Sequence, residues 1–202
     1  MKGLILKDFY NLGRQNKVIL AAIAFYLIFS LANKDSSFFG GMLTFLMVMQ
    51  TMTAMAYDEK SKWDRYALAM PVSRTDMVLS KYILGVILLV IAFAANLIFM
   101  VATGTEPVMA LNVSLVMAGI GLFSILVTLP VLFKFGMEKG RYIIMLIFLI
   151  PTVIGFLGPK MGLKMPDESF MRLLPVLGLL ILIISGIVSV SISLAVYKRK
   201  EM

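Results

Sequence analysis

The side chains best suited to recognising a partner lie in one hydrophilic segment, Asp58 to Tyr82. Within it, Trp63, Tyr66, Ala67 and Met70 recur at the spacing of a single helix face. Aromatic residues and arginine are the types that most often dominate protein–protein interfaces. The alternative is that the same face rests on lipid headgroups, where Trp and Tyr also accumulate. The spacing alone leaves both interpretations open.

The same segment predicts two helices joined by a tight turn. Pro71 ends the first helix, because the residue before a proline avoids the α region. Ser73 and Asp76 then form an S-x-x-D start signal for the second helix. We expect this second helix to continue past Tyr82 into the apolar stretch that follows.

Several kinds of chemistry are excluded by composition and motif. Cysteine and histidine are both absent, which excludes thiolate nucleophiles, imidazole bases and soft metal sites. No G-x-x-x-x-G-K-[ST] motif occurs, and the stretch Gly158 to Lys164 is a near-match with the wrong spacing. The chain therefore encodes no P-loop ATPase site. We predict that it is not an enzyme and has no cofactor of its own.

The elements that must position the hydrophilic segment are long apolar stretches without any Asp, Glu, Lys, Arg or His. A helix needs about 20 apolar residues to cross a hydrocarbon core of about 30 Å. Backbone groups in lipid must be satisfied within the segment, so such stretches are helical. We predict an all-α polytopic membrane protein, one transmembrane domain over 1–202. Its six predicted spans are 18–32, 38–57, 83–102, 108–133, 142–157 and 173–196.

The cations set the expected orientation. The net charge of +8 would indicate nucleic acid in a soluble protein, but here the distribution explains it without a nucleic-acid partner. Of the 19 Lys and Arg residues, 15 lie before the first span, in 58–82, in 134–141 and in the tail. The other connections, 33–37, 103–107 and 158–172, hold the remaining four. The positive-inside rule then predicts that both termini are cytoplasmic.

The first 17 residues predict an interfacial elbow helix that leads into span one. On a helical projection the apolar arc and the polar arc separate, with Leu4 as the exception. The alternatives are a frayed terminus, or a cleaved leader that ends at Ser30-Leu31-Ala32. The apolar arc holds Ile5, Leu6, Phe9, Tyr10 and Leu12, and the polar arc holds Lys7, Asp8, Asn11, Arg14 and Gln15.

A few polar side chains fall inside the predicted spans. Gln50 and Asn96 are the most polar groups near mid-span, and Thr53 lies close to Gln50. They are candidates for lining a substrate path. The alternative is that they form interhelical hydrogen bonds, the commoner role of such groups in membrane bundles.

Four motifs resemble one family of transport proteins. They are Met1 to Tyr10, the Asp58-Glu59-Lys60-x-x-Trp63 element, Leu68 to Arg74, and Val78 to Tyr82. On these residues the chain resembles ABC-2 type transporter permeases, in particular the small bacterial subfamily similar to bacitracin and phenol-soluble-modulin peptide exporters. Met70 departs mildly from the leucine usual before this proline.

The resemblance implies that the segment 58–82 holds a coupling helix that docks on a separate ABC ATPase subunit, where ATP and Mg bind. It also implies a second permease chain, identical or paralogous, a bacterial plasma-membrane location and an amphipathic cargo such as a peptide or peptide antibiotic. A passive channel or membrane interaction subunit without an ATPase is the alternative. The residues implicated in ATPase coupling are Asp58, Glu59, Lys60, Trp63, Arg65, Tyr66 and Arg74.

Overall fold

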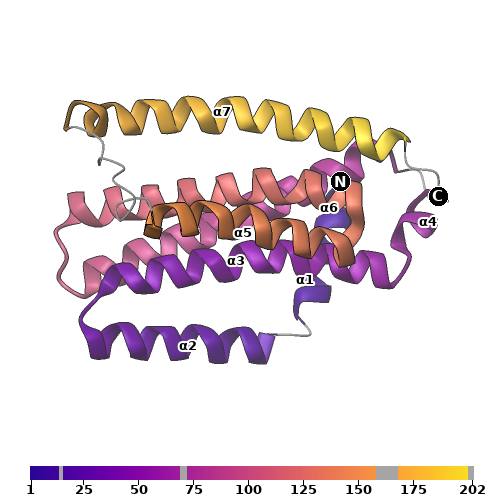
Figure 1. Ribbon diagram of the computed structural model, residues 1–202. Coiled ribbons are helices and arrows are strands. Elements are labelled where there is room, and N and C mark those ends of the chain that lie inside the picture. The colour runs from indigo at the N-terminus through magenta and orange to yellow at the C-terminus, as the bar shows by residue number, and fades with distance from the viewer. Residues whose placement is uncertain (14–15, 69–71, 158–167, 200–202) are drawn as a thin grey trace.

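The computed structural model of the chain describes residues 1–13, 16–68, 72–157 and 168–199, and within these ranges the protein is helical without a strand. Figure 1 shows the helices lying largely alongside one another. In chain order they are α1 (Lys2–Gly13), α2 (Asn16–Asn33), α3 (Ser36–Lys60), α4 (Trp63–Leu68), α5 (Arg74–Ala102), α6 (Pro107–Leu157) and α7 (Glu168–Arg199).

Every one of the predicted apolar stretches is helical. Four helices of the described chain are long and apolar enough to cross a membrane: α3, α5, α6 as far as Ile150, and α7 from Val176. The pair α1 and α2, which meet at an angle of 71°, would form a fifth crossing. The protein is therefore a multi-pass membrane protein, and six crossings remain a prediction.

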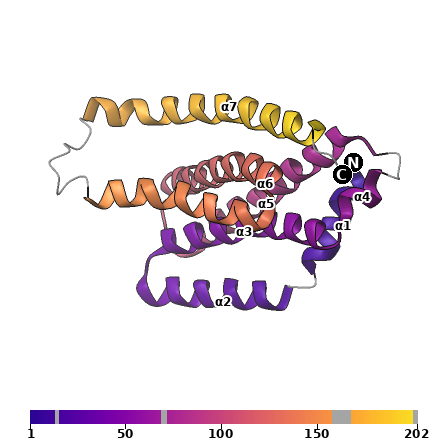
Figure 2. The ribbon, with the colours of Figure 1, turned by 45° about the vertical axis from the view of Figure 1, so that its right-hand side comes forward.

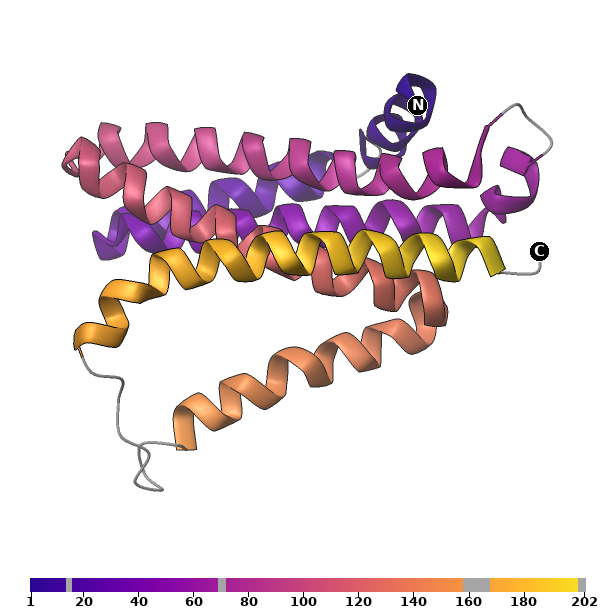
Figure 3. The same ribbon diagram turned by 90° about the horizontal axis from the view of Figure 1, so that it is seen from above.

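Successive long helices run in opposite directions, so their ends gather at two ends of the bundle (Figures 1 and 3). One end holds α1, α4, the start of α5 and the end of α7. There Arg74 Nη1 donates a hydrogen bond of 2.5 Å to the Lys198 carbonyl oxygen. The hydrophilic segment is thus assembled with both terminal helices at one end of the molecule.

The starts of two long helices are fixed by side-chain caps. Ser73 accepts a hydrogen bond of 3.0 Å from the Asp76 amide, which confirms the predicted S-x-x-D start of α5. Asp35 plays the same part at α3, accepting from the amides of Ser37 and Phe38. Such caps satisfy amides that have no partner within the helix. The predicted turn at Pro71 lies outside the described residues.

The residues 134–141 were expected to form a loop, and this is wrong, because they are helical except at one position. Gly136 has φ 74° and ψ −179°, a conformation that is essentially restricted to glycine. At this break α6 turns back on itself, so that its first arm (107–135) and second arm (137–157) run in opposite directions (Figure 3). A Cβ on Gly140 would lie 2.8 Å from Leu132 Cδ2, so the two arms approach closely beside the break.

A second boundary also differs from expectation. The residues 168–172 belong to α7, whereas the sequence placed them in the outer loop 158–172. The part of that predicted loop at 158–167 lies outside the described residues. The outer connections 33–37 and 103–107 are short, as expected, since α3 begins at Ser36 and α6 begins at Pro107.

The core lies where α3, α5 and α6 pack against one another, around the fully buried Leu84, Ile125 and Leu129. By contrast, α2 and α7 expose long rows of apolar side chains, including Phe25, Ile28 and Ile184. An apolar outer face is what a membrane protein presents to lipid, and there it carries no penalty.

Candidate functional site

The helix α1 packs on the bundle along a stripe that does not coincide with the predicted apolar arc. Leu4, Asp8 and Leu12 are its buried residues, one helical turn apart. Tyr10 of the predicted apolar arc is exposed instead, as is Leu6. Asp8 of the predicted polar arc is buried, with a side chain that is only 1% exposed, which the prediction of an interfacial helix did not include.

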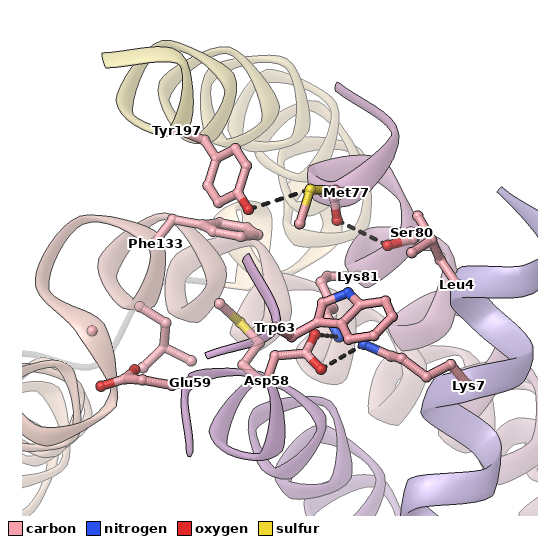
Figure 4. Close-up of a pocket in the computed structure, with 13 residues that line it drawn as sticks. Leu4, Lys7, Asp58, Glu59, Trp63, Met77, Ser80, Lys81, Phe133 and Tyr197 are labelled. Atoms are coloured by element: carbon pink, nitrogen blue, oxygen red, sulfur yellow. Dashed lines mark hydrogen bonds and ion pairs between the residues drawn. The ribbon is translucent and has the colours of Figure 1, made fainter. Parts of the chain in front are cut away.

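Asp8 belongs to a closed set of four charged side chains, which we call the charge ring: Lys7, Asp8, Asp58 and Lys81. Lys81 Nζ lies 2.7 Å from Asp8 Oδ2 and 2.6 Å from Asp58 Oδ2. Lys7 Nζ lies 2.5 Å from Asp58 Oδ1. It also lies 3.1 Å from Asp8 Oδ1, an ion pair without hydrogen-bond geometry. Figure 4 shows both ammonium groups directed at the Asp58 carboxylate.

The composition of the ring explains how four charges can be held below the surface. Two carboxylates and two ammonium groups sum to zero, and each carboxylate lies between both cations. Taking ions out of water costs several kcal/mol each, and only close opposite charges repay this cost. Because Asp58 ends the buried face of α3 and Lys81 lies in α5, the ring ties α1, α3 and α5 together.

The short helix α4 is set against this ring. The chain turns out of α3 at Lys62, which has φ 52°, and the next residue is Trp63. Its half-buried indole packs on the core, and Lys7 Nζ lies 4.4 Å from the ring centroid. Such cation–π contacts contribute about 0.5–2 kcal/mol. On the same helix Ala67 is fully buried, whereas Tyr66 is 63% exposed.

A small cavity of about 60 Å³ opens between these elements. Trp63, Asp58 and Lys81 line one side, and Phe133 and Tyr197 line another (Figure 4). The two aromatic rings of the second side are T-shaped, with centroids 5.6 Å apart. A volume of this size accommodates a few water molecules. Within the described residues, no group of Asp and Glu side chains is arranged to hold a metal ion.

The residues predicted for ATPase coupling do not all lie together. Asp58 and Trp63 meet at the charge ring, and Arg74 bonds the end of α7. Glu59 also lines the cavity, but its side chain extends away from the Asp58 carboxylate (Figure 4), and Lys60 is exposed. The side chain of Arg65 lies outside the described residues. Tyr66 is the aromatic group of this set that points outward.

The candidate path residues are spread along α3 and α5. Asn96 is buried, and its Nδ2 donates to Ser114 Oγ at 2.9 Å. Thr53 donates to the Met49 carbonyl of its own helix. Gln50 is buried, and its Oε1 has no hydrogen-bond partner among the described residues. The bond from Asn96 is of the interhelical type, while a role in a path stays a prediction for all three.

Three of the four ring members are not among the predicted site residues: Lys7, Asp8 and Lys81. Their partners lie 51 and 73 residues away in the chain, beyond the reach of a helical projection. A usable signal is present nevertheless. Asp58 and Lys81 are charges of opposite sign that directly border the second and third apolar stretches, so both are expected at the same end of the bundle.

Comparison with known proteins identifies the family. A model described as ABC-2 family transporter protein matches residues 3–198, nearly the whole chain. No curated protein and no solved structure matches. The chain therefore belongs to the ABC-2 transporter family and is a membrane-spanning permease of the ABC transporter class.

Proposed function

We propose that this permease is the membrane half of an ATP-driven exporter whose energy comes from a separate ATPase subunit. Two permease chains, identical or paired with a paralogue, would form the pathway, and two ATPase subunits would bind below them. Membership of the family supports a permease role. The absence of a P-loop motif anywhere in the sequence supports an external source of energy.

The observation that carries the proposal is the way α4 is built into the bundle. Trp63 and Ala67 pack inward, and the charge ring beside them joins α1, α3 and α5. A displacement of α4 is therefore transmitted to α1, α3 and α5 through buried contacts rather than through a flexible loop. Tyr66 points outward from the same helix and supplies an aromatic contact for a partner.

The proposed orientation places this end of the bundle in the bacterial cytoplasm. The exposed Lys60, Lys62, Lys134, Lys139 and Arg141 belong to it, which agrees with the positive-inside rule. With the reversal of α6 at Gly136, the alternating helices make six crossings. Both termini then lie on the cytoplasmic side of the plasma membrane.

The proposed cargo is hydrophobic or amphipathic, such as a peptide or a peptide antibiotic. This class rests on the resemblance to bacterial peptide exporters. It agrees with predicted spans that contain no charged side chain and only scattered polar groups such as Gln50 and Thr53. An ion-coupled carrier usually places an ionisable group in the membrane, and the apolar stretches contain none.

Purification in mild detergent from the native membrane tests the proposal. We expect an ATPase subunit with a P-loop to copurify in a 1:1 ratio with the permease, identified by mass spectrometry. A permease that purifies only as an oligomer of itself would contradict the exporter and favour the passive channel. Treatment with 1 M salt serves as a control, because it removes proteins bound through surface charge alone.

A further inference from the structure

Glu59 makes a contact with the break in α6, a part of the molecule far from the charge ring in sequence. Its neighbour Asp58 turns toward Lys7 and Lys81, whereas Glu59 extends to the other side of α3 (Figure 4). There its Oε2 accepts a hydrogen bond of 2.7 Å from the Met137 amide, 78 residues away in the chain. The end of α3 is thereby joined to the break in α6.

The local geometry at the break shows why a carboxylate fits there. Met137 begins the second arm of α6, and the first amides of a helix have no partner within it. A carboxylate satisfies such an amide and is favoured by the helix dipole. A Cβ on Gly136 would lie 3.3 and 3.4 Å from the two Glu59 oxygens, so the carboxylate is seated directly against this glycine.

The second arm is anchored mainly near the break. Gly140 and Ile144 are buried, whereas Met145, Ile150 and Val153 farther along are exposed. Figures 2 and 3 show this arm, in orange, leaving the break and diverging from α7. At 1.5 Å per residue the arm is about 30 Å long. A small rotation at Gly136 therefore becomes a large displacement at its far end.

We propose that Glu59 is the positioning residue that transmits movement of α3 and α4 to the second arm of α6. This inference rests on the proposed function, because the movement begins when ATPase subunits close under α4. The Glu59 carboxylate then acts on the chain's own hinge at Gly136, and not on the ATPase surface. Through it, a push on the α3–α4 connection reorients the second arm of α6, which contains the fifth predicted span, 142–157.

The contact itself is tested first, on the permease alone. Amide hydrogen exchange at Met137, measured by fragmentation mass spectrometry, should rise about threefold to tenfold in Glu59→Ala and less in Glu59→Gln, which retains an acceptor oxygen. The matched control is Glu138→Gln. It removes the same charge beside the hinge from an exposed side chain. Equal exchange in wild type and Glu59→Ala would overturn the inference.

The transmission is tested in the complex with its ATPase, reconstituted in lipid. The chain lacks cysteine, so cysteines introduced at positions 109 and 150 are the only sites that a thiol-reactive spin label can modify. These positions lie in the two arms of α6, far from the break. We expect ATP with vanadate to shift the distance between these labels in wild type and in Glu138→Gln. Glu59→Ala should lose the shift while it retains the bound ATPase.

Two results separate the inference from the function on which it rests. A full shift in Glu59→Ala would overturn the role of Glu59 and leave the ATP-driven exporter intact. A wild-type permease that binds no ATPase would instead overturn the proposed function. Glu59→Gln guards against misfolding, because it preserves the shape of the side chain and should give an intermediate shift.

Discussion

Lys81 of α5 and Asp8 of α1 form a buried ion pair, with 2.7 Å between Nζ and Oδ2, across 73 residues of sequence. Their side chains are 7% and 1% exposed, respectively. The pair fixes the helix that precedes the first span to the start of the third. The terminal helix is therefore an integral part of the folded bundle and shares the charge ring with the α3–α4 connection.

Removing one charge from the ring should destabilise the protein markedly. Asp8→Asn leaves Lys7 and Lys81 with one carboxylate between them, and breaking a buried pair from one side costs about 3–5 kcal/mol. The free energy of unfolding, measured by titration with SDS in mixed micelles, reports this loss. Asp76→Asn, in the half-exposed first turn of α5, is the matched control and should cost less than about 1 kcal/mol.

The double variant Asp8→Asn with Lys81→Gln extends this test. Because it restores the neutrality of the ring, it should be less destabilised than the sum of the two single variants. We expect an interaction free energy of about 1–3 kcal/mol between the sites. Strict additivity would show that the two charges do not form a pair in the folded protein.

Two adjacent glycines in α3 should respond differently to substitution by alanine. A Cβ on Gly40 would lie 2.4 Å from Asn96 Oδ1, whereas on Gly41 the nearest atom is Met117 Sδ at 3.8 Å. Gly40→Ala must displace the Asn96 side chain that bonds Ser114, so we expect a loss of about 1–3 kcal/mol. Gly41→Ala should be close to neutral in the same unfolding assay, and equal losses would contradict this packing.

The reversal of α6 predicts the side on which single cysteines react. Lys139→Cys, just after the break, and Tyr66→Cys should react with a membrane-impermeant maleimide only in opened cells. Glu106→Cys, before α6, should react in intact cells. The chain supplies no competing thiol. Reaction of position 139 from outside would contradict two crossings by α6.

Substitutions of Trp63 and Tyr66 should have different effects: the first should lower the stability of the permease, and the second should weaken its binding of the ATPase. Trp63→Ala removes a core contact and the cation–π contact with Lys7, and we expect a loss of about 3–5 kcal/mol in stability together with impaired coupling. Tyr66→Ala should leave stability unchanged but lower the amount of copurified ATPase at least threefold. The opposite outcome, normal copurification with lost stability in Tyr66→Ala, would place Tyr66 in the core.

Much of the helical framework is predictable because lipid imposes length and polarity on each crossing. The apolar stretches are all helical, and the local S-x-x-D signal at Ser73 gives the start of α5 correctly. The hinge was missed for a physical reason. Gly136 lies in a short stretch that also holds Lys134, Glu138 and Lys139. In the sequence alone, a sharp break at a glycine within such a charged stretch is indistinguishable from a loop.

The charge ring was missed for a different reason. A helical projection groups charged residues on one arc, so it placed Asp8 on the polar arc of the first helix, away from the apolar arc. Whether a charge is buried depends on partners contributed by other helices, here Asp58 and Lys81. Trp63 shows the same limit. Its spacing left a protein partner and lipid headgroups both open, and in the structure its ring contacts the ammonium group of Lys7 in the same chain.

Crosslinking in native membranes shows whether α4 is the docking point of an ATPase. A photoreactive amino acid at position 66 should yield one dominant adduct, a P-loop ATPase subunit identified by mass spectrometry. The same group at position 109, near the opposite end of the bundle, should not yield that adduct. An ATPase adduct from position 109 alone, or none from position 66, would contradict the account.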